Sequence, residues 1–285
     1  MHTILSNEEL AIDVRRLWVE AAHVARKRRP GQFVIVRIDE AGERIPLTIA
    51  DVDLRRGAIA LVVQGVGKTT KKLNVLPAGA ALLDVVGPLG RPTRITPGAR
   101  VCCVGGGIGT AVVYPIACGV GEAGGEVVSI IGGRTRELVI LEDELRKVSS
   151  QILVTTDDGS YGMPGLVTDA LATLLARGER FDEIVAVGPL PMMRAVCEMT
   201  RPLGLKTIVS LNPVMVDGTG MCGGCRVTVG GEQKFVCVDG PEFDGHLVDF
   251  DGLAARLRAY REQEALALRL YEDDLEFACR SMGTV

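Results

Sequence analysis

Short hydrophobic runs separated by turn residues fill the first third of the chain. The clearest are QFVIVRI, GAIALVV and AALLDVV, and each has glycine or proline nearby. Runs of this kind are typical of β-strands, and no long helical period accompanies them. The pattern therefore predicts a small antiparallel β-barrel over residues 1–97.

From about residue 98, apolar runs alternate with segments that are compatible with helices. The runs are ARVCCVG, GEVVSIIG, SQILVTT, DEIVAVG and KTIVSLN. Helices are expected between them over residues 110–118, 136–148, 164–176 and 191–200. This alternation predicts a parallel sheet covered on both faces, so we expect a Rossmann-like α/β domain over residues 98–212.

Two shorter parts follow the α/β region. Residues 213–250 are rich in glycine and contain cysteines with metal-ligand spacing, which predicts a small cofactor-binding module. Residues 251–285 are charged and carry a broken apolar stripe. They predict a C-terminal helix that docks on the rest of the chain rather than a separate domain.

Composition narrows the class of protein. The chain has 285 residues, of which 47% are hydrophobic, and this suits two domains with sizeable cores. A net charge of -4 offers no basic face for nucleic acid. The N-terminus lacks the features of a secretory signal, so the eight cysteines point to a reducing, cytoplasmic compartment.

One segment needs separate consideration because it carries no charge. Residues 101–121 lack Asp, Glu, Lys and Arg and are long enough to span a bilayer. A glycine triplet and Pro115 interrupt the segment, which favours a buried strand, a glycine turn and a buried helix. Small buried hydrophobes are also the favoured interpretation of the scattered cysteines, which are Cys102, Cys103, Cys118, Cys197 and Cys279.

The sequence VCCVGGGIGTA places glycines where the first strand of the α/β region turns into a helix. Glycine lets the backbone approach a pyrophosphate, and the helix N-terminus supplies unpaired N–H groups. The G-x-G-x-x-G form is incomplete, so a plain tight turn remains the alternative. The candidate nucleotide-binding residues are Gly105, Gly107, Gly109 and Thr110.

Two later strand ends should lie at the same edge of the sheet. TTDDG follows the third strand and GPLPM follows the fourth. Their polar groups and Gly-Pro turn suit a ribose and a nicotinamide, with a plain loop as the alternative for each. The candidates are Asp157, Asp158, Gly188, Pro189 and Met192. The two aspartates would repel a 2′-phosphate and favour NAD(H) over NADP(H), whereas Arg134 would favour the opposite.

The tetrapeptide GKTT at 67–70 looks like part of an ATP-binding P-loop. However, Val62 stands where the first glycine of that motif belongs. ATP binding is therefore rejected at this position. Backbone N–H groups and Lys68 could still hold another phosphate.

Cys222, Cys225 and Cys237 form the pattern C-x2-C-x11-C. Plant-type [2Fe–2S] proteins use C-x4-C-x2-C with a distant fourth cysteine, and Asp217 stands where the first cysteine belongs. The favoured interpretation is a [2Fe–2S] cluster with Asp217 as the fourth ligand, because iron also accepts carboxylates. Two alternatives stay open: Asp217 only starts a turn, or a structural zinc is bound with His246 as a ligand.

Nearly the whole chain resembles the ferredoxin reductase-like electron-transfer subunits. These include the electron-transfer subunit of dihydroorotate dehydrogenase and, closer, the small subunit of NADH-dependent reduced ferredoxin:NADP oxidoreductase. The dihydroorotate dehydrogenase subunits carry four cysteines in the cluster motif and this chain has three, which favours the NADP-linked relative. The motifs that carry the resemblance are RIPLTIAD, VGKTT, VGGGIGTA, DDGSYG, DGTGMCGGC and FVCVDGPEFDG.

The resemblance implies an oxidoreductase subunit that moves electrons between NAD(H), FAD and a [2Fe–2S] cluster, without an acid–base residue as the chemical centre. A larger partner subunit with a second FAD and further clusters would handle NADP(H) and ferredoxin. The rival functions are a dihydroorotate dehydrogenase subunit and, outside enzymes, a nucleotide-sensing module with a zinc knuckle. The residues implied to hold FAD are Arg44, Pro46, Leu47 and Thr48, with Gly67, Lys68 and Thr69 near its pyrophosphate.

Overall fold

The computed structural model describes the backbone of residues 1–282 and the side chains of residues 1–274. Its first sheet is antiparallel, with seven strands in the order β6-β1-β2-β5-β4-β3-β7. Two short helices, α1 (Ala22–Lys27) and α2 (Lys68–Asn74), lie between strands of this sheet. The strands are β1 (His2–Ala11), β2 (Val14–Glu20), β3 (Phe33–Arg37), β4 (Arg44–Asp53), β5 (Ala58–Gln64), β6 (Ala81–Leu82) and β7 (Asp84–Leu89).

The barrel contains β1, β2 and α1, which the three predicted runs do not mark, and it differs from the predicted pattern at two further points. The single run AALLDVV is divided between β6, which pairs with β1, and β7, which pairs with β3. The chain changes partner at Leu83, whose N–H donates to the carbonyls of Arg37 and Ile38. Residues 68–74 are helical because the Thr70 hydroxyl accepts the N–H groups of Val66 and Gly67 and so stabilises the helix start.

The second sheet has the order β11-β10-β9-β8-β12-β13-β16 and is parallel except for β16. Each of the five predicted runs coincides with one of its strands to within one or two residues at either end. They are β8 (Arg100–Gly106), β9 (Glu126–Gly133), β10 (Gln151–Thr156), β12 (Glu183–Val187) and β13 (Thr207–Ser210), with β11 (Met163–Pro164) and β16 (Glu242–Asp244) at the edges.

Helices cover both faces of the second sheet. The 3-10 turn η1 (Gly107–Gly109) leads into α3 (Thr110–Glu122), which packs on one face together with α4 (Glu142–Val148). The other face carries α5 (Val167–Ala176) and α6 (Leu190–Thr200). Two further 3-10 turns are η2 (Arg136–Leu138) and η3 (Arg201–Leu203). Parallel neighbours need crossover connections, which these helices provide, so the predicted alternation is confirmed.

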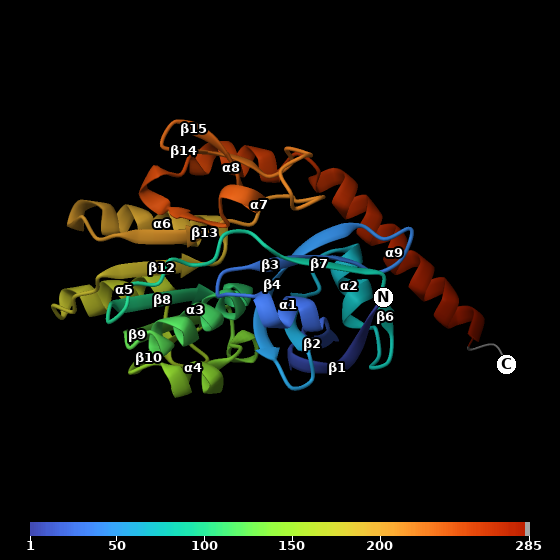
Figure 1. Ribbon diagram of the computed structural model, residues 1–285, viewed down its shortest axis with the longest axis horizontal. Helices are drawn as coiled ribbons and strands as arrows, with labels where there is room; N and C mark the ends of the chain where they lie inside the picture. The colour runs from blue at the N-terminus through green and yellow to red at the C-terminus, as the bar shows by residue number, and fades with distance from the viewer. Residues whose placement is uncertain (283–285) are drawn as a thin grey trace.

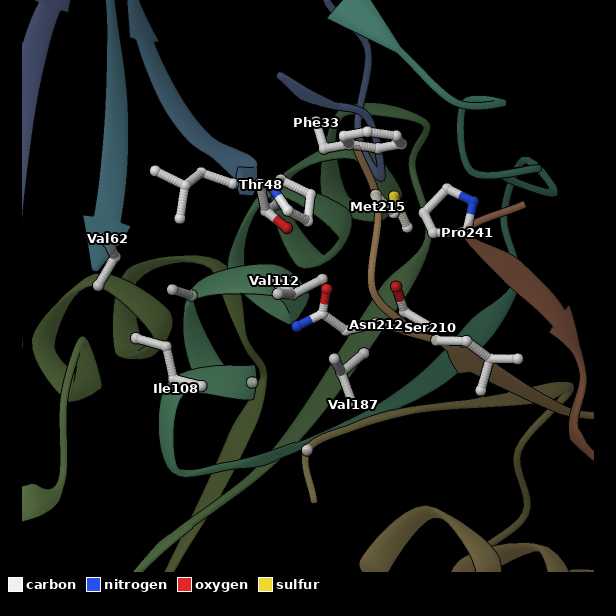
Figure 2. Close-up of a pocket in the computed structure, with 16 residues that line it drawn as sticks. Phe33, Thr48, Val62, Ile108, Val112, Val187, Ser210, Asn212, Met215 and Pro241 are labelled. Atoms are coloured by element: carbon white, nitrogen blue, oxygen red, sulfur yellow. The ribbon is translucent and has the colours of Figure 1, made fainter. Parts of the chain in front are cut away.

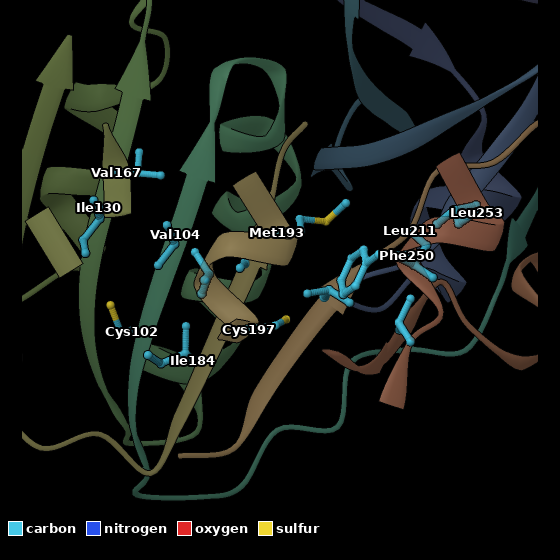
Figure 3. Close-up of a cluster of buried hydrophobic side chains, with 14 of the residues drawn as sticks. Cys102, Val104, Ile130, Val167, Ile184, Met193, Cys197, Leu211, Phe250 and Leu253 are labelled. Carbon is cyan, nitrogen blue, oxygen red and sulfur yellow. The ribbon is translucent and has the colours of Figure 1, made fainter. Parts of the chain in front are cut away.

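The cysteine module and the tail pack on the far edge of this sheet. The module contains the hairpin of β14 (Arg226–Val229) and β15 (Glu232–Phe235), the helix α7 (Val236–Asp239) and the turn η4 (Gly245–Leu247). Helices α8 (Phe250–Leu257) and α9 (Arg261–Met282) follow. Phe250 and Leu253 of α8 share one core with the sheet, as Figure 3 shows beside Met193 and Cys197. The module is therefore fused to the α/β domain.

Figure 1 shows the three layers of the molecule: the barrel, the α/β sheet, and the cysteine module with the tail. Helix α9, drawn in red, runs outward along the barrel side that carries α2. The predicted fold class is confirmed: a barrel, a Rossmann-like sheet, a small cysteine module and a C-terminal helix. The predicted single tail helix is two helices in the structure, because α8 ends at Leu257 and α9 starts at Arg261.

The uncharged segment 101–121 forms β8, the glycine turn and most of α3, as predicted. Among the described residues, no helix combines the length and the hydropathy that crossing a membrane requires. Cys102, Cys103 and Cys197 are buried and Cys118 is half-buried, which agrees with their interpretation as small hydrophobes. The side chain of Cys279 lies outside the described residues.

Candidate functional site

The barrel, the α/β sheet and the segment after β13 meet at a cavity of about 160 Å³. Figure 2 shows Thr48 from β4, Ile108 from the glycine turn, and Asn212 from the segment after β13 around the same space. Met215, which comes shortly before the cysteine loop, lines it as well. Three parts of the chain that are far apart in sequence therefore line the same cavity.

A wider groove of about 870 Å³ continues from this cavity. Most of the lining of the narrow cavity is apolar, and Thr48, Ser210 and Asn212 add a few polar groups. An apolar pocket with few, well-placed polar groups suits a flat ring system with a polar edge, such as a flavin. The residues that line both spaces are Pro46, Leu47, Val62, Ile108, Asn212 and Met215.

The structure brings the RIPLT residues to this groove. Pro46 and Leu47 line both spaces, Thr48 lines the narrow one and Arg44 lines the wide one. The GKTT turn is close by, since Thr70 is also part of the wide groove. Gly67, Lys68 and Thr69 are absent from the groove lining. The Thr69 hydroxyl donates to the carboxylate of Glu43, which lines the groove itself.

The glycines of the nucleotide turn have different roles. Gly107 has a φ of +55°, and nothing lies within 4 Å of the position of an added Cβ, so it presents open backbone before α3. Gly109 is packed tightly, because an added Cβ would lie 2.1 Å from the carbonyl oxygen of Val187. Gly105 approaches the backbone of Thr110, whose side chain is buried. Gly107 thus leaves the backbone accessible, while Gly105 and Gly109 allow other backbone segments to pack closely.

The fourth strand end lies against the glycine turn. An added Cβ on Gly188 would lie 3.2 Å from the Cα of Gly106 and 2.7 Å from the Met192 sulfur. Pro189 is the N-cap residue of α6, and Pro191 in the first turn has a backbone that suits a helix start. Met192 therefore packs over both Gly106 and Gly188. The ends of β8 and β12 lie at the same edge of the sheet, as expected.

The third strand end is held by hydrogen bonds within its own loop. The Asp158 carboxylate accepts the N–H of Ser160 at 2.9 Å and its hydroxyl at 2.6 Å. These bonds hold the pKa of Asp158 below its usual range. The Asp158 N–H donates to the carbonyl of Arg134, so the acidic loop and the arginine are neighbours. Asp157 and Asp158 are both exposed.

Two of the three candidate cysteines are adjacent. The sulfurs of Cys225 and Cys237 lie 3.2 Å apart and both residues are buried, while Cys222 is exposed. Burial raises the pKa of Cys237 to about 12, and the Cys225 thiol adds to the effect. Among the side chains that the structure describes, no three His, Cys, Asp or Glu converge on one metal position. The thiols fit an iron–sulfur cluster in chemistry and spacing, but Cys222 must turn inward to complete the set.

Asp217 holds the start of the cysteine loop. Its carboxylate accepts the N–H of Thr219 at 2.8 Å and that of Cys222 at 2.9 Å. These bonds lower the pKa of Asp217, so the group is a carboxylate, as a ligand must be. His246 instead makes a 2.9 Å hydrogen bond with the Thr200 hydroxyl beside α6. His246 therefore lies outside the cysteine group, which argues against the zinc alternative.

Several groove residues have no counterpart among the sequence-predicted candidates. Ser210 and Asn212 lie at the end of the fifth apolar run, Met215 follows that run, and Pro241 comes from the cysteine module. The rule that ligands bind beyond the carboxyl ends of parallel strands could have identified Ser210 and Asn212. Nothing in the local pattern marks Met215 or Pro241, because their positions depend on how the module docks.

A comparison with protein families finds a match for the cysteine module. The iron-sulfur cluster binding domain of dihydroorotate dehydrogenase B matches residues 212–249. This range contains Asp217 and the three candidate cysteines.

Relatives that match most of the chain also carry the name of dihydroorotate dehydrogenase B. The dihydroorotate dehydrogenase B (NAD(+)) electron transfer subunit homolog of Thermotoga maritima is 48% identical over 99% of this chain and 98% of its own length. The dihydroorotate dehydrogenase B (NAD(+)) electron transfer subunit of Geobacillus thermodenitrificans is 36% identical over 85% of this chain and 95% of its own.

A solved structure is also similar over nearly the whole chain. It belongs to the NADH-dependent reduced ferredoxin-NADP oxidoreductase and matches with a TM-score of 0.90 at 48% identity. The match covers 96% of this chain and 98% of that one. Barrel, sheet, module and tail therefore have counterparts in one solved chain.

Proposed function

This chain belongs to the family of dihydroorotate dehydrogenase B electron-transfer subunits and their homologues, and we propose that it passes electrons between NAD(H) and an iron–sulfur cluster through FAD. It is an oxidoreductase subunit, and its cofactors are FAD, NAD(H) and an iron–sulfur cluster. The likeness to the NADH-dependent reduced ferredoxin-NADP oxidoreductase supports the small subunit of an enzyme of that type, with electron bifurcation as its reaction class.

One observation carries the proposal. A single cavity is lined by Thr48 of the barrel, by Gly109 of the nucleotide turn and by Met215, two residues before Asp217. A nicotinamide exchanges two electrons as a hydride, a cluster accepts one at a time, and bound FAD can do both. The chain's task is to hold the three groups at this junction.

The barrel residues would hold the flavin. Pro46 and Leu47 offer apolar walls, Thr48 offers a hydroxyl in the narrow cavity, and Arg44 offers a positive charge in the wide groove. A guanidinium suits a pyrophosphate. Gly67, Lys68 and Thr69 would support the same pyrophosphate from the neighbouring turn.

The strand ends of the α/β sheet would hold the nicotinamide nucleotide. Open backbone at Gly107 and the start of α3 suit its pyrophosphate, while Gly105, Gly109 and Thr110 keep strand and helix close. Gly188, Pro189 and Met192 would border the nicotinamide, since they lie beside the glycine turn.

Asp157 and Asp158 would border the ribose of the nucleotide and favour NAD(H). Their loop lies beside Arg134, which could instead accept a 2′-phosphate. Titration of the flavin-loaded chain with both nucleotides tests the preference. Tighter binding of NADP(H) would reverse the assignment.

The cysteine loop would hold a [2Fe–2S] cluster. Cys225 and Cys237 are adjacent and Cys222 comes from the same loop, with Asp217 as the fourth ligand. Glycines with positive φ at 218, 220 and 223 let this loop fold tightly around its centre.

As an electron-transfer subunit, the chain acts with a larger partner subunit. We infer that this partner carries a second FAD and further clusters and handles NADP(H) and ferredoxin. The family profile over residues 212–249 keeps a dihydroorotate dehydrogenase partner as the second candidate. Isolation of the native complex and assay with ferredoxin plus NADP+, or with dihydroorotate, separates the two.

Anaerobic purification of the full chain tests the central proposal. We expect a yellow-brown protein with about one FAD, about two iron atoms and about two acid-labile sulfides per chain. NADH should bleach the flavin absorbance. A colourless protein, or zinc in place of iron, would refute the proposal and favour a nucleotide-sensing module.

A further inference from the structure

The wide groove has a wall that the flavin barrel does not provide. The barrel and the segment after β13 form two sides, and the C-terminal tail forms the third. Four of the tail residues are spaced three, one and three positions apart, as on one face of a helix. The tail residues that line the groove are Leu257, Tyr260, Gln263, Glu264 and Ala267.

The tail is fixed at both ends of this wall. Before the groove, the guanidinium of Arg256 donates to the carbonyl of Gly224 at 3.0 Å, in the loop between Cys222 and Cys225. Beyond the groove, Lys71 of α2 forms a 2.6 Å ion pair with Glu272. The segment between these contacts therefore lies across the groove instead of projecting away from it.

The charges along the groove indicate which part of a dinucleotide each region suits. Arg44 is the cation of the lining, while Glu43 and Glu264 are acidic. A phosphate would be repelled by the two carboxylates, whereas ribose hydroxyls can donate to them. The narrow cavity, which shares Pro46 with the groove, is the part that suits the flavin ring.

The tail side chains suit a purine nucleoside. Tyr260 is 57% exposed and offers an aromatic ring at the groove, and the Gln263 amide offers both a donor and an acceptor. Aromatic rings stack on bases, and an amide can form paired hydrogen bonds with the edge of an adenine.

We propose that residues 257–267 of the tail bind the adenosine half of FAD and so select FAD over FMN. This inference rests on the proposed function, because it requires the flavin to occupy the groove. The tail thereby forms a binding wall and is more than a docking helix.

Flavin binding to the full chain tests the inference. FMN lacks the adenylate half, so the ratio of the FMN and FAD dissociation constants isolates what that half contributes. Tyr260→Ala should weaken FAD binding about tenfold and leave FMN binding unchanged, whereas Tyr260→Phe should keep most of the FAD affinity. Leu266→Ala is the matched control, since Leu266 lies in α9, shortly after Tyr260, is exposed and does not line the groove.

The outcomes separate this inference from the proposed function. If the unmodified chain binds neither FAD nor FMN, the proposed function itself is wrong. A chain that binds FAD, but whose Tyr260→Ala and Gln263→Ala variants keep the original FMN-to-FAD ratio, overturns only the role of the tail. Unchanged iron and sulfide contents and an unchanged unfolding temperature in each variant show that the fold and the cluster are intact.

Discussion

The α/β sheet and the cysteine loop are stabilised in different ways. All five residues of β12 are buried, and the sheet has helices on both faces. The loop from 217 to 224 exposes Met221 and Cys222 and is held by the Asp217 carboxylate and by glycine turns. The sheet owes its shape to apolar burial, while the loop owes its shape to hydrogen bonds and glycine turns.

Among the substitutions that separate the loop from the sheet, removal of one buried cysteine should have the largest effect. Cys225→Ala takes away a proposed thiolate ligand that lies beside Cys237, so we expect loss of the cluster with flavin and NAD(H) binding retained. Iron and sulfide analysis measures the loss of the cluster, and titration with NADH measures the binding of the nucleotide. Cys118→Ala, outside the module, should keep both; full iron content in Cys225→Ala would contradict the ligand assignment.

Substitution of Asp217 should have the next largest effect. Asp217→Ala removes the proposed fourth ligand and two loop hydrogen bonds, so the cluster should be bound loosely or lost. Asp217→Cys should keep the cluster and change its reduction potential and electronic spectrum. If Asp217→Ala leaves spectrum and potential as they were, the carboxylate only shapes the turn.

The sheet should respond to core substitutions without any change in the cluster. Leu171 in α5 is fully buried, and Leu171→Ala should lower the free energy of unfolding by about 2–5 kcal/mol through lost burial and a cavity. Denaturant unfolding measures the loss, and iron content should stay constant. Leu270→Ala, on the exposed tail, should change stability by about 0.5 kcal/mol or less.

The smallest effect is expected at β16, the strand of the cysteine module that pairs with the sheet. It should be seen as a dependence of stability on pH. Burial raises the pKa of Glu242 on β16 to about 7, Glu183 adds to the rise, and the Thr93 hydroxyl opposes it. Between pH 4.5 and about 7 the folded state binds more protons than the unfolded state, so stability falls as pH rises through this window and then levels.

The loss from Glu242 amounts to at most about 3 kcal/mol. Glu242→Gln should flatten this part of the pH profile, as measured by urea unfolding at several pH values. Glu262→Gln, on the exposed first turn of α9, is the control and should leave the slope unchanged. An identical slope in Glu242→Gln would show that the buried carboxyl is not its source.

The five parallel strands from β8 to β13 could be predicted from the sequence because burial on both faces makes continuous apolar runs, whereas β1 and β2 alternate with polar residues and form no such run. The division of AALLDVV into β6 and β7 could not, since the chain changes partner at Leu83 through pairing with distant strands. Helix α2 was missed for a similar reason: seven residues carry little periodicity, and its start depends on one Thr70 hydroxyl.

The candidate site was predictable where chemistry is local. The cysteine spacing and the glycine turn are continuous in sequence, whereas RIPLT had meaning only through the family resemblance. The positions of Met215 and Pro241 at the narrow cavity, and of the tail residues at the wide groove, could not be foreseen, because each depends on the docking of a distant element. A helix pattern shows that the tail has an apolar stripe but not what that stripe faces.

The uncharged segment 101–121 has a consequence for synthesis of the protein. Its strand β8 is central and pairs with β9 and with β12, which lies roughly 80 residues further along the chain. At about 5–20 residues per second, a ribosome needs roughly 4–16 s to complete that partner. During this interval one edge of a strongly apolar strand has no neighbour, so nascent chains should depend on chaperones, and slower translation between β9 and β12 should increase aggregation.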